Sequence, residues 1–340
     1  MKILIWNAQH LDNQSRALVS NAYKEKTEFL DKYLLSQNDE VDIVVLLETG
    51  KTGNTNKTLD AFFKGRTNSY ELVTKLGQDD GFTKHTTLGI NVYAKPEIAR
   101  DLERMPYVLG DKERRGAVIV KYGNKLLAFY HANSSKKSFD HISSSIEFIQ
   151  QQFSEDLVFF GGDLNYDYSA MPENLRKMEK LGHNGPGYTH TKIEYPISDE
   201  LQEKLNRRYY STIRRHGLER TFNSSYGNYR RELTYRQTHG IKKDYKLHTA
   251  TMNKRLRAWD DKFEVAEEDF DFRYLVQKTP TREALVTRSF LDYALVDNVG
   301  DWSADCHGVT LQIGDDVLRY CNGLSMRSDH FPVIYTTHTL

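Results

Sequence analysis

Ten short apolar runs, four to seven residues long, do most to restrict how this chain can fold. Several of them, such as ILIW, LLAFY and LVFF, are apolar at every position and do not alternate with polar residues. Strands with this pattern are covered on both faces, so the runs predict buried β-sheets. The runs span residues 3–6, 41–47, 88–93, 117–121, 126–130, 157–160, 290–296, 309–313, 317–320 and 332–335.

Two segments between these runs have helical periodicity. Residues 22–35 and 143–153 repeat apolar side chains at the spacing of one helix face. Strands outnumber helices and alternate with them irregularly. The sequence therefore predicts an α/β fold in which two sheets pack together and helices lie outside them.

Composition excludes some classes of protein. The chain has 340 residues, and its 47 Lys and Arg balance its 47 Asp and Glu. Attraction to a polyanion must therefore come from local clustering of charge. The first residues, MKILIWNAQ, contain no secretory apolar stretch, and no run approaches 18 apolar residues. We expect no membrane span, and a protein that is cytoplasmic or exported without a cleaved signal peptide.

The two cysteines, Cys306 and Cys321, bracket a predicted hairpin with a turn at Gly314-Asp315. They can form one disulfide or remain two thiols in a reducing compartment. We favour the thiols.

A basic, aromatic segment covers residues 184–288, where tyrosines are interleaved with arginines and lysines. Such a segment can neutralise phosphates and stack on bases. The alternative is a solvated subdomain paired with the acidic run at 260–271. We favour contact with nucleic acid, and three arginines in the segment are candidates for binding the substrate: Arg230, Arg231 and Arg236.

Polar side chains follow several of the apolar runs, and we expect them to meet in one cleft. Cleavage of a phosphodiester needs cationic groups on the phosphate oxygens, a base, and stabilisation of the leaving oxygen. Glu48, after VDIVVLL, suits Mg²⁺, which binds one or two protein carboxylates and keeps several waters. In GGDLN, two glycines allow a sharp turn that projects Asp163 and Asn165 toward one side. The alternative there is an Asx-turn that closes the strand.

The segment Ser328-Asp329-His330 adds a carboxylate and an imidazole that titrates near neutral pH. Asp292 lies in an apolar run, where a carboxylate is costly unless paired, and His330 is a suitable partner. His131 ends another run and is a candidate donor to a phosphate oxygen. Further candidates for binding phosphate or substrate are Arg114, Arg115 and Asn133, and Asn7 is a candidate for positioning Glu48 or the metal shell.

The order of the motifs WNAQ, LLETG, RRGA, YHANSS, GGDLNYD, LDYALV and SDHFPV resembles the endonuclease/exonuclease/phosphatase superfamily. The motifs are most similar to those of deoxyribonuclease I and the cytolethal distending toxin catalytic subunit. The resemblance covers the chain apart from 184–288. It implies a four-layered α/β sandwich of two packed mixed β-sheets flanked by helices, with the site on one rim. The whole chain, 1–340, would be one catalytic domain with an insertion at about 184–288.

The resemblance also implies a metal site. Glu48 would bind the metal, with Asn7 and Asp329 supporting it. The expected ion is Mg²⁺, with Mn²⁺ or Ca²⁺ as substitutes. Position 47 is Leu where many relatives carry Gln, and we expect a mild effect because the ligand itself remains.

The remaining roles concern the reaction. Asp163 and Asn165 would hold the water and the phosphate, and His330 with Asp292 would be the general base. His131 would be a phosphate donor or acid, although the sequence offers it no clear acidic partner.

Three functions compete. The favoured one is a Mg²⁺-dependent endonuclease that hydrolyses DNA, in preference to RNA, by in-line attack of water. The second is a phosphatase or phosphodiesterase acting on inositol lipids or another small phosphoester. The third is a non-catalytic nucleic-acid-binding relative, which the complete set of site residues argues against. The sequence identifies no protein partner.

Overall fold

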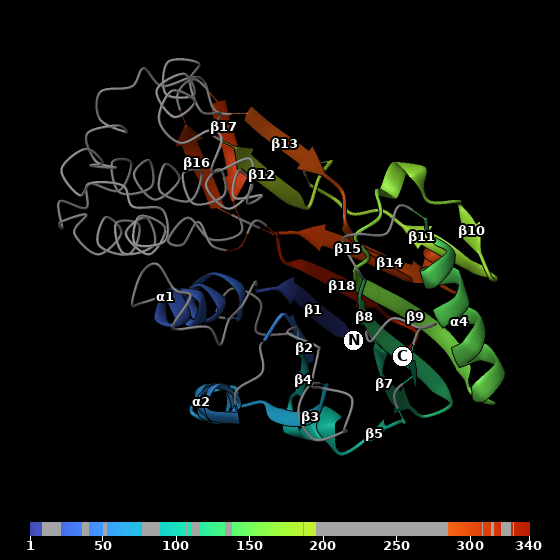
Figure 1. Ribbon diagram of the computed structural model, residues 1–340. Helices are drawn as coiled ribbons and strands as arrows, with labels where there is room; N and C mark the ends of the chain where they lie inside the picture. The colour runs from blue at the N-terminus through green and yellow to red at the C-terminus, as the bar shows by residue number, and fades with distance from the viewer. Residues whose placement is uncertain are drawn as a thin grey trace, which may run out of the picture. The chain divides into compact units, whose positions relative to one another are not determined.

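The computed structural model of the chain describes residues 1–8, 22–35, 41–49, 53–76, 89–106, 108–109, 116–132, 138–185, 187–194, 285–307, 309–313, 316–320, 328 and 330–340 (Figure 1). The chain divides into two compact units. The first consists of Met1–Thr191, Arg288–Leu311 and Val317–Leu340, and the second of Lys192–Thr287 and Gln312–Asp316. Most of the predicted insertion at 184–288 lies outside the described residues, so its structure stays a prediction.

The first unit contains two mixed β-sheets. One has six strands in the order β15-β18-β1-β2-β4-β3, and the other has eight, in the order β10-β11-β14-β9-β8-β7-β5 with β6 paired to β7. The pairs β1–β2 and β8–β9 are parallel, and the other pairs in these sheets are antiparallel. The strands of the six-stranded sheet are β1 (Lys2–Asn7), β2 (Ile43–Leu47), β3 (Glu71–Leu76), β4 (Ile90–Ala94), β15 (Trp302–Cys306) and β18 (Val333–Thr337). Those of the larger sheet are β5 (Leu102–Arg104), β6 (Val108–Leu109), β7 (Gly116–Tyr122), β8 (Lys125–His131), β9 (Asp156–Asp163), β10 (Asn174–Leu175), β11 (Met178–Leu181) and β14 (Asp292–Val296).

Four further strands form two-stranded ladders. β12 (His190–Glu194) pairs with β13 (Leu285–Ser289), and β16 (Val309–Ile313) pairs with β17 (Asp316–Tyr320). The second ladder agrees with the hairpin predicted at these residues. Its turn and Cys321 lie outside the described residues, so the state of the two cysteines stays a prediction, and Cys306 is buried in β15.

The helices agree in part with the sequence. The predicted helix at 22–35 is α1 (Ala22–Phe29), which continues as the π-helix η1 (Leu30–Leu35), and the helix at 143–153 is α4 (Asp140–Gln152). The helices that the sequence did not predict are α2 (Gly53–Lys64), α3 (Pro96–Ala99) and the short 3-10 turns η2 (Tyr168–Ala170) and η4 (Val299–Asp301). α2 begins with the turn-like sequence GNTN and has its apolar residues only in its second half, which hides its periodicity.

Alternation of side chains along the strands creates the layers. In β1, Ile3 and Ile5 lie in the core between the two sheets, whereas Leu4 and Trp6 pack with residues of α1 and α2. In β8, Phe129 belongs to the core between the sheets, and Tyr130 packs with residues of α4. Both faces of each sheet are therefore covered, which explains the continuous apolar runs.

The predicted fold class is confirmed. Two mixed sheets face each other, with α1 and α2 on the outer face of the six-stranded sheet and α4 on the outer face of the larger one. Phe159 of β9 joins the two sheets, because its ring lies 5.1 Å from both Trp302 and Tyr335 of the opposite sheet. Within the described residues, no helix has the length and apolar character needed to span a membrane.

Candidate active site

Three neighbouring strands of the eight-stranded sheet carry polar residues at the same level. His131, the last residue of β8, pairs with Asp163, the last residue of β9, and Asp163 pairs with Asp292, the first residue of β14. Adjacent strands lie about 4.8 Å apart, so this register brings the three side chains to one end of the sheet.

The two glycines before Asp163 let β9 lie close to both of its neighbours, β8 and β14. Gly162 has φ 146°, and a Cβ atom there would lie 2.0 Å from the carbonyl oxygen of Tyr130. A Cβ atom at Gly161 would lie 2.9 Å from the Cβ of Ala294. Side chains at either position would push apart the strands that hold the site.

Asp163 also closes the strand, as the Asx-turn interpretation predicted. The backbone N–H of Asn165 donates to Asp163 Oδ1 at 3.1 Å. Asn165 has φ 47°, a left-handed conformation that asparagine tolerates better than most residues. One hydrogen of its side-chain amide donates to the carbonyl oxygen of Ala132 at 3.0 Å. Asp163 therefore uses Oδ1 for the turn, and Oδ2 points to other groups.

The six-stranded sheet brings its own residues to the same end. β1 ends at Asn7, whose register partner on the parallel strand β2 is Leu47, and Glu48 follows directly with φ 55°. A left-handed backbone at a non-glycine residue costs about 1 to 2 kcal/mol, and such strain is concentrated at functional positions. Ser328 Oγ donates to the carbonyl oxygen of Asn7 at 2.7 Å, which anchors the segment before β18 to the end of β1.

Asp163 Oδ2 is the centre of the arrangement. Asn7 Nδ2 donates to it at 2.9 Å, His131 Nε2 lies 3.2 Å away, and His330 Nε2 lies 3.7 Å away. The carboxylate is 1% exposed. Burial opposes its ionisation, but the charge of His330 and the hydrogen bonds from His131 and Asn7 outweigh that effect and hold the pKa of Asp163 well below its usual range. Asp163 is therefore an anion that these three side chains hold in place.

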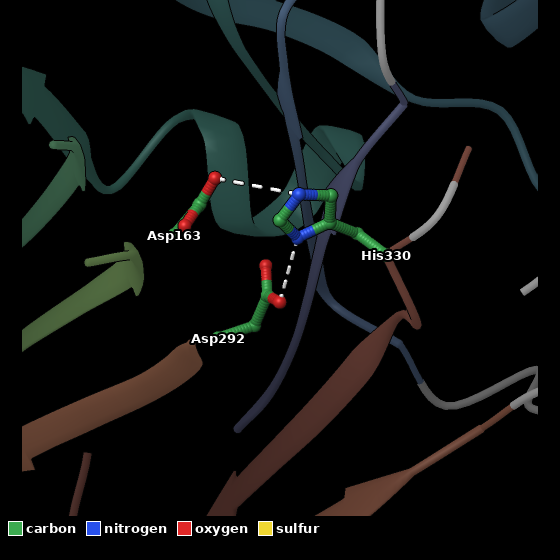
Figure 2. A group of neighbouring side chains, drawn as sticks. All are labelled: Asp163, Asp292 and His330. Atoms are coloured by element: carbon green, nitrogen blue, oxygen red, sulfur yellow. Dashed lines mark hydrogen bonds and ion pairs between the residues drawn. The ribbon is translucent and has the colours of Figure 1, made fainter. Parts of the chain in front are cut away.

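His330 lies between two carboxylates (Figure 2). Its Nδ1 is 2.8 Å from Asp292 Oδ2, and its Nε2 faces Asp163. Burial raises the pKa of Asp292, whereas the charge of His330 and its hydrogen bond act in the opposite direction. When Nδ1–H donates to Asp292, the lone pair of the neutral ring is on Nε2, so Nε2 is the nitrogen that can accept a proton.

His131 has the acidic neighbours that the sequence did not reveal. Its Nε2 lies 3.2 Å from Asp163 Oδ2 and 3.6 Å from Glu48 Oε1. Glu48 comes from the other sheet, so the absence of an acid near His131 in the sequence did not mean an absence in space. Among the described residues, the buried Nδ1 of His131 has no hydrogen-bond partner, so we place the proton of the neutral ring on Nε2.

Solved structures resemble this chain over nearly its whole length, whereas no protein-family model and no curated protein matches it. Truncated TDP2 of Caenorhabditis elegans has 10% identity and a TM-score of 0.45, with 99% of this chain and 96% of that chain covered. TDP2 of D. rerio, complexed with a single-strand DNA product, has 13% identity and a TM-score of 0.44, with 99% of each chain covered. The cytolethal distending toxin of Actinobacillus actinomycetemcomitans has 14% identity and a TM-score of 0.42, with 99% and 97% covered.

Identities this low do not transfer an activity from one protein to another. The chemistry of the site therefore follows from its own side chains.

Among the described residues, two sets of side chains are candidates for holding a divalent cation, one found in the structure and one predicted from the sequence. Asp163, Asp292 and His330 offer ligand atoms that all lie within 4.8 Å of one another. A cation among them would have an imidazole nitrogen of His330 as one ligand. Glu48 offers a carboxylate and Asn7 an amide oxygen, and Mg²⁺ prefers oxygen ligands. The Glu48 group therefore suits Mg²⁺ better.

Seven of the eight predicted catalytic and metal-binding residues are described, and the strand ends bring all seven to this region. They are Asn7, Glu48, His131, Asp163, Asn165, Asp292 and His330. Their roles in a reaction stay predictions. The candidates outside the described residues are Asp329, Arg114, Arg115, Asn133, Arg230, Arg231 and Arg236.

Two residues beside the site were not predicted from the sequence. Thr189 is fully buried and accepts hydrogen bonds from the backbone of Leu291 and Asp292. His190 forms an isolated β-bridge with His330. Neither residue directly follows an apolar run, and neither is a carboxylate that burial would make costly. The polar run Thr189-His190-Thr191 after a glycine-rich turn was the only signal.

Proposed function

We propose that this chain is a divalent-metal-dependent phosphodiesterase, and specifically an endonuclease that hydrolyses DNA. The observation that carries the proposal is the group around Asp163 Oδ2, where Asn7, His131 and His330 converge on one buried carboxylate. The motif resemblance to the endonuclease/exonuclease/phosphatase superfamily supports the same chemistry.

In the proposed reaction, a water molecule attacks phosphorus in line with the leaving sugar oxygen. Its proton passes to His330 Nε2 as the new oxygen–phosphorus bond forms and the bond to the leaving oxygen breaks. Asp292, 2.8 Å from Nδ1, orients the ring and stabilises the imidazolium that results. Asp163 and Asn165 orient the water and the phosphate, and His131 Nε2–H donates to a phosphate oxygen.

A bound divalent cation would neutralise charge on the phosphate oxygens and stabilise the leaving oxygen. The residues that would hold it are Glu48, with Asn7 and Asp329 in support. Glu48 and Asn7 supply the hard oxygen donors that Mg²⁺ requires, and Mn²⁺ or Ca²⁺ are the expected substitutes.

The preference for DNA depends on the basic, aromatic segment at 184–288. Its interleaved tyrosines, arginines and lysines suit a polynucleotide better than a small phosphoester. Inositol phosphates or lipids are the alternative substrates for the same site, and the experiment must separate the two.

The test is incubation of the purified chain with supercoiled plasmid and Mg²⁺, with and without a chelator. We expect nicking that the chelator abolishes and that His330→Ala reduces at least about 10²-fold. His338→Ala is the matched control, because His338 is exposed near the C-terminus and should leave nicking unchanged. Intact plasmid with phosphate release from an inositol phosphate would favour the small-phosphoester alternative. Neither activity would favour a non-catalytic relative.

A further inference from the structure

Thr189 lies between the two chain segments that supply Asp292 and His330. Its side chain is fully buried, and its Oγ1 accepts hydrogen bonds from two successive backbone amides. These are Leu291 N–H at 3.0 Å and Asp292 N–H at 2.8 Å. A hydroxyl oxygen has two lone pairs, so this oxygen uses its full accepting capacity to hold the start of β14.

The backbone of Thr189 holds the other segment. Its carbonyl oxygen accepts from Phe331 N–H at 2.7 Å, and Phe331 directly follows His330. The backbone N–H of Thr189 donates to the carbonyl oxygen of Ser289 at 3.0 Å, and Ser289 belongs to the same chain segment as Asp292. One residue is therefore bonded to the chain on both sides of the contact between Asp292 and His330.

His190 continues this arrangement toward the imidazole. It forms an antiparallel β-bridge with His330, and the two ring centroids are 4.7 Å apart at an interplanar angle of 53°. At this distance the rings are in contact, so His190 limits the orientations that the His330 ring can adopt.

Packing alone does not explain a threonine at this position. Valine has the same shape and would suit a fully buried site, but it offers no acceptor to the two amides. A buried amide that loses its partner must move toward another acceptor or stay unsatisfied. Movement of the amide of Asp292 would carry its carboxylate away from Nδ1, because the two groups belong to one residue.

We propose that Thr189 is the positioning residue of the Asp292–His330 pair, and that His190 packs against the imidazole to fix its orientation. Neither residue needs to touch the substrate. The inference rests on the proposed function, because the pair is the general base of that reaction. Loss of the positioning by Thr189 should therefore lower the rate of the chemical step and leave substrate binding unchanged.

The experiment compares Thr189→Val and Thr189→Ser in the full chain. We expect Thr189→Val to lower kcat for hydrolysis of a fluorescent oligonucleotide by at least about 30-fold, with KM within about threefold of the wild type. Thr189→Ser keeps the acceptor and should recover kcat to within about threefold. Thr337→Val is the matched control, because Thr337 is also fully buried and its Oγ1 accepts from the amide of Thr339.

A spectroscopic measurement separates this inference from the proposed function. The proton that His330 Nδ1 donates to Asp292 should give a downfield ¹H NMR signal, which His330→Ala identifies by its loss. We expect Thr189→Val to shift or broaden this signal, and Thr189→Ser and Thr337→Val to preserve it. A wild-type chain without hydrolase activity would contradict the proposed function, whereas the NMR comparison would still decide the role of Thr189.

Several results would overturn the proposal. Wild-type kcat and an unchanged signal in Thr189→Val would do so, as would equal losses in Thr189→Val and Thr189→Ser. If Thr189→Val does not fold, His190→Ala and His190→Phe test the positioning instead. Only the phenyl ring of His190→Phe replaces the surface that packs against the His330 imidazole. We expect His190→Ala to lower kcat and disturb the signal more than His190→Phe does, and equal values in the two variants would refute the positioning.

Discussion

Replacement of Asp292 by asparagine should separate the activity of this protein from its stability. Asp292 is 3% exposed, and its Oδ2 lies 2.8 Å from His330 Nδ1. Asparagine has the same shape but no charge, and its amide can present either a donor or an acceptor to the imidazole. The change therefore alters the partner of the proposed base while leaving the packing of β14 intact.

The expected loss of activity follows from this one contact. A hydrogen bond to a charged group contributes about 1.5 to 3 kcal/mol, which corresponds to about 10- to 200-fold in rate. In Ser-His-Asp triads the same change costs about 10⁴ in kcat, because the imidazole takes the wrong tautomer. We therefore expect kcat to fall between about 10- and 10⁴-fold, with KM within about threefold of the wild type.

Stability should not fall with activity. Burial raises the pKa of Asp292 above its ordinary value of 3.8, so the ionised carboxylate is less favourable in the folded protein than in the unfolded chain. The folded protein therefore favours protonated Asp292. The wild type has its full stability below the unfolded pKa of Asp292 and loses stability as the pH rises through the folded pKa. Asp292→Asn should therefore be at least as stable as the wild type at neutral pH, and this advantage should shrink as the pH falls through the folded pKa of Asp292 toward 3.8.

The assay is steady-state hydrolysis of an oligonucleotide with Mg²⁺, combined with urea unfolding at neutral and acidic pH. Asp297→Asn is the control, because Asp297 is exposed and directly follows β14. A loss in kcat below about tenfold would refute the role of Asp292 in orienting the base. A large drop in the free energy of unfolding at neutral pH would refute the reasoning from its burial.

Two further predictions concern the strands and the charge at the centre of the site. Gly162→Ala should destabilise the fold by about 4 kcal/mol or more in urea unfolding, because its Cβ would lie 2.0 Å from the carbonyl oxygen of Tyr130. Gly123→Ala, at φ 60° with nothing within 4 Å, should cost only about 1 to 2 kcal/mol, and equal costs would contradict the steric argument. The lowered pKa of Asp163 means that its contribution to stability is present above its ordinary value of 3.8 and is lost as the pH falls through the folded pKa. The wild type should thus have a larger free energy of unfolding than Asp163→Asn at neutral pH. Urea unfolding at about pH 3 should show a smaller difference between the two proteins. A difference that does not change with pH would show that this charge does not stabilise the fold.

The sequence predicted the central strands of both sheets and missed those near the edges. Continuous apolar runs correspond to β18, β1, β2 and β4 in one sheet and to β14, β9, β8 and β7 in the other. The strands missed in these sheets are β15 and β3, at the edges of the first, and β10, β11, β5 and β6, at or near those of the second. β15 shows the reason, because WSADC alternates buried and exposed residues and contains no continuous apolar run.

The types of the candidate site residues were also readable from the sequence. A polar residue directly after an apolar run lies at a strand end, and a buried carboxylate such as Asp292 requires a partner. These local rules singled out Glu48, Asp163 and His330 before any coordinates. They depend only on the chemistry of each segment and on the two-residue period of a strand.

The contacts among these residues were decided by the tertiary structure alone. His131 lies 3.6 Å from Glu48, which belongs to the opposite sheet, and Asn7 donates to Asp163 at a separation of 156 residues. Strand order and register set these distances, and a local apolar pattern does not encode which strands become neighbours. For the same reason the sequence did not reveal Thr189. Its hydrogen bonds beside Asp292 form only because three distant chain segments meet there.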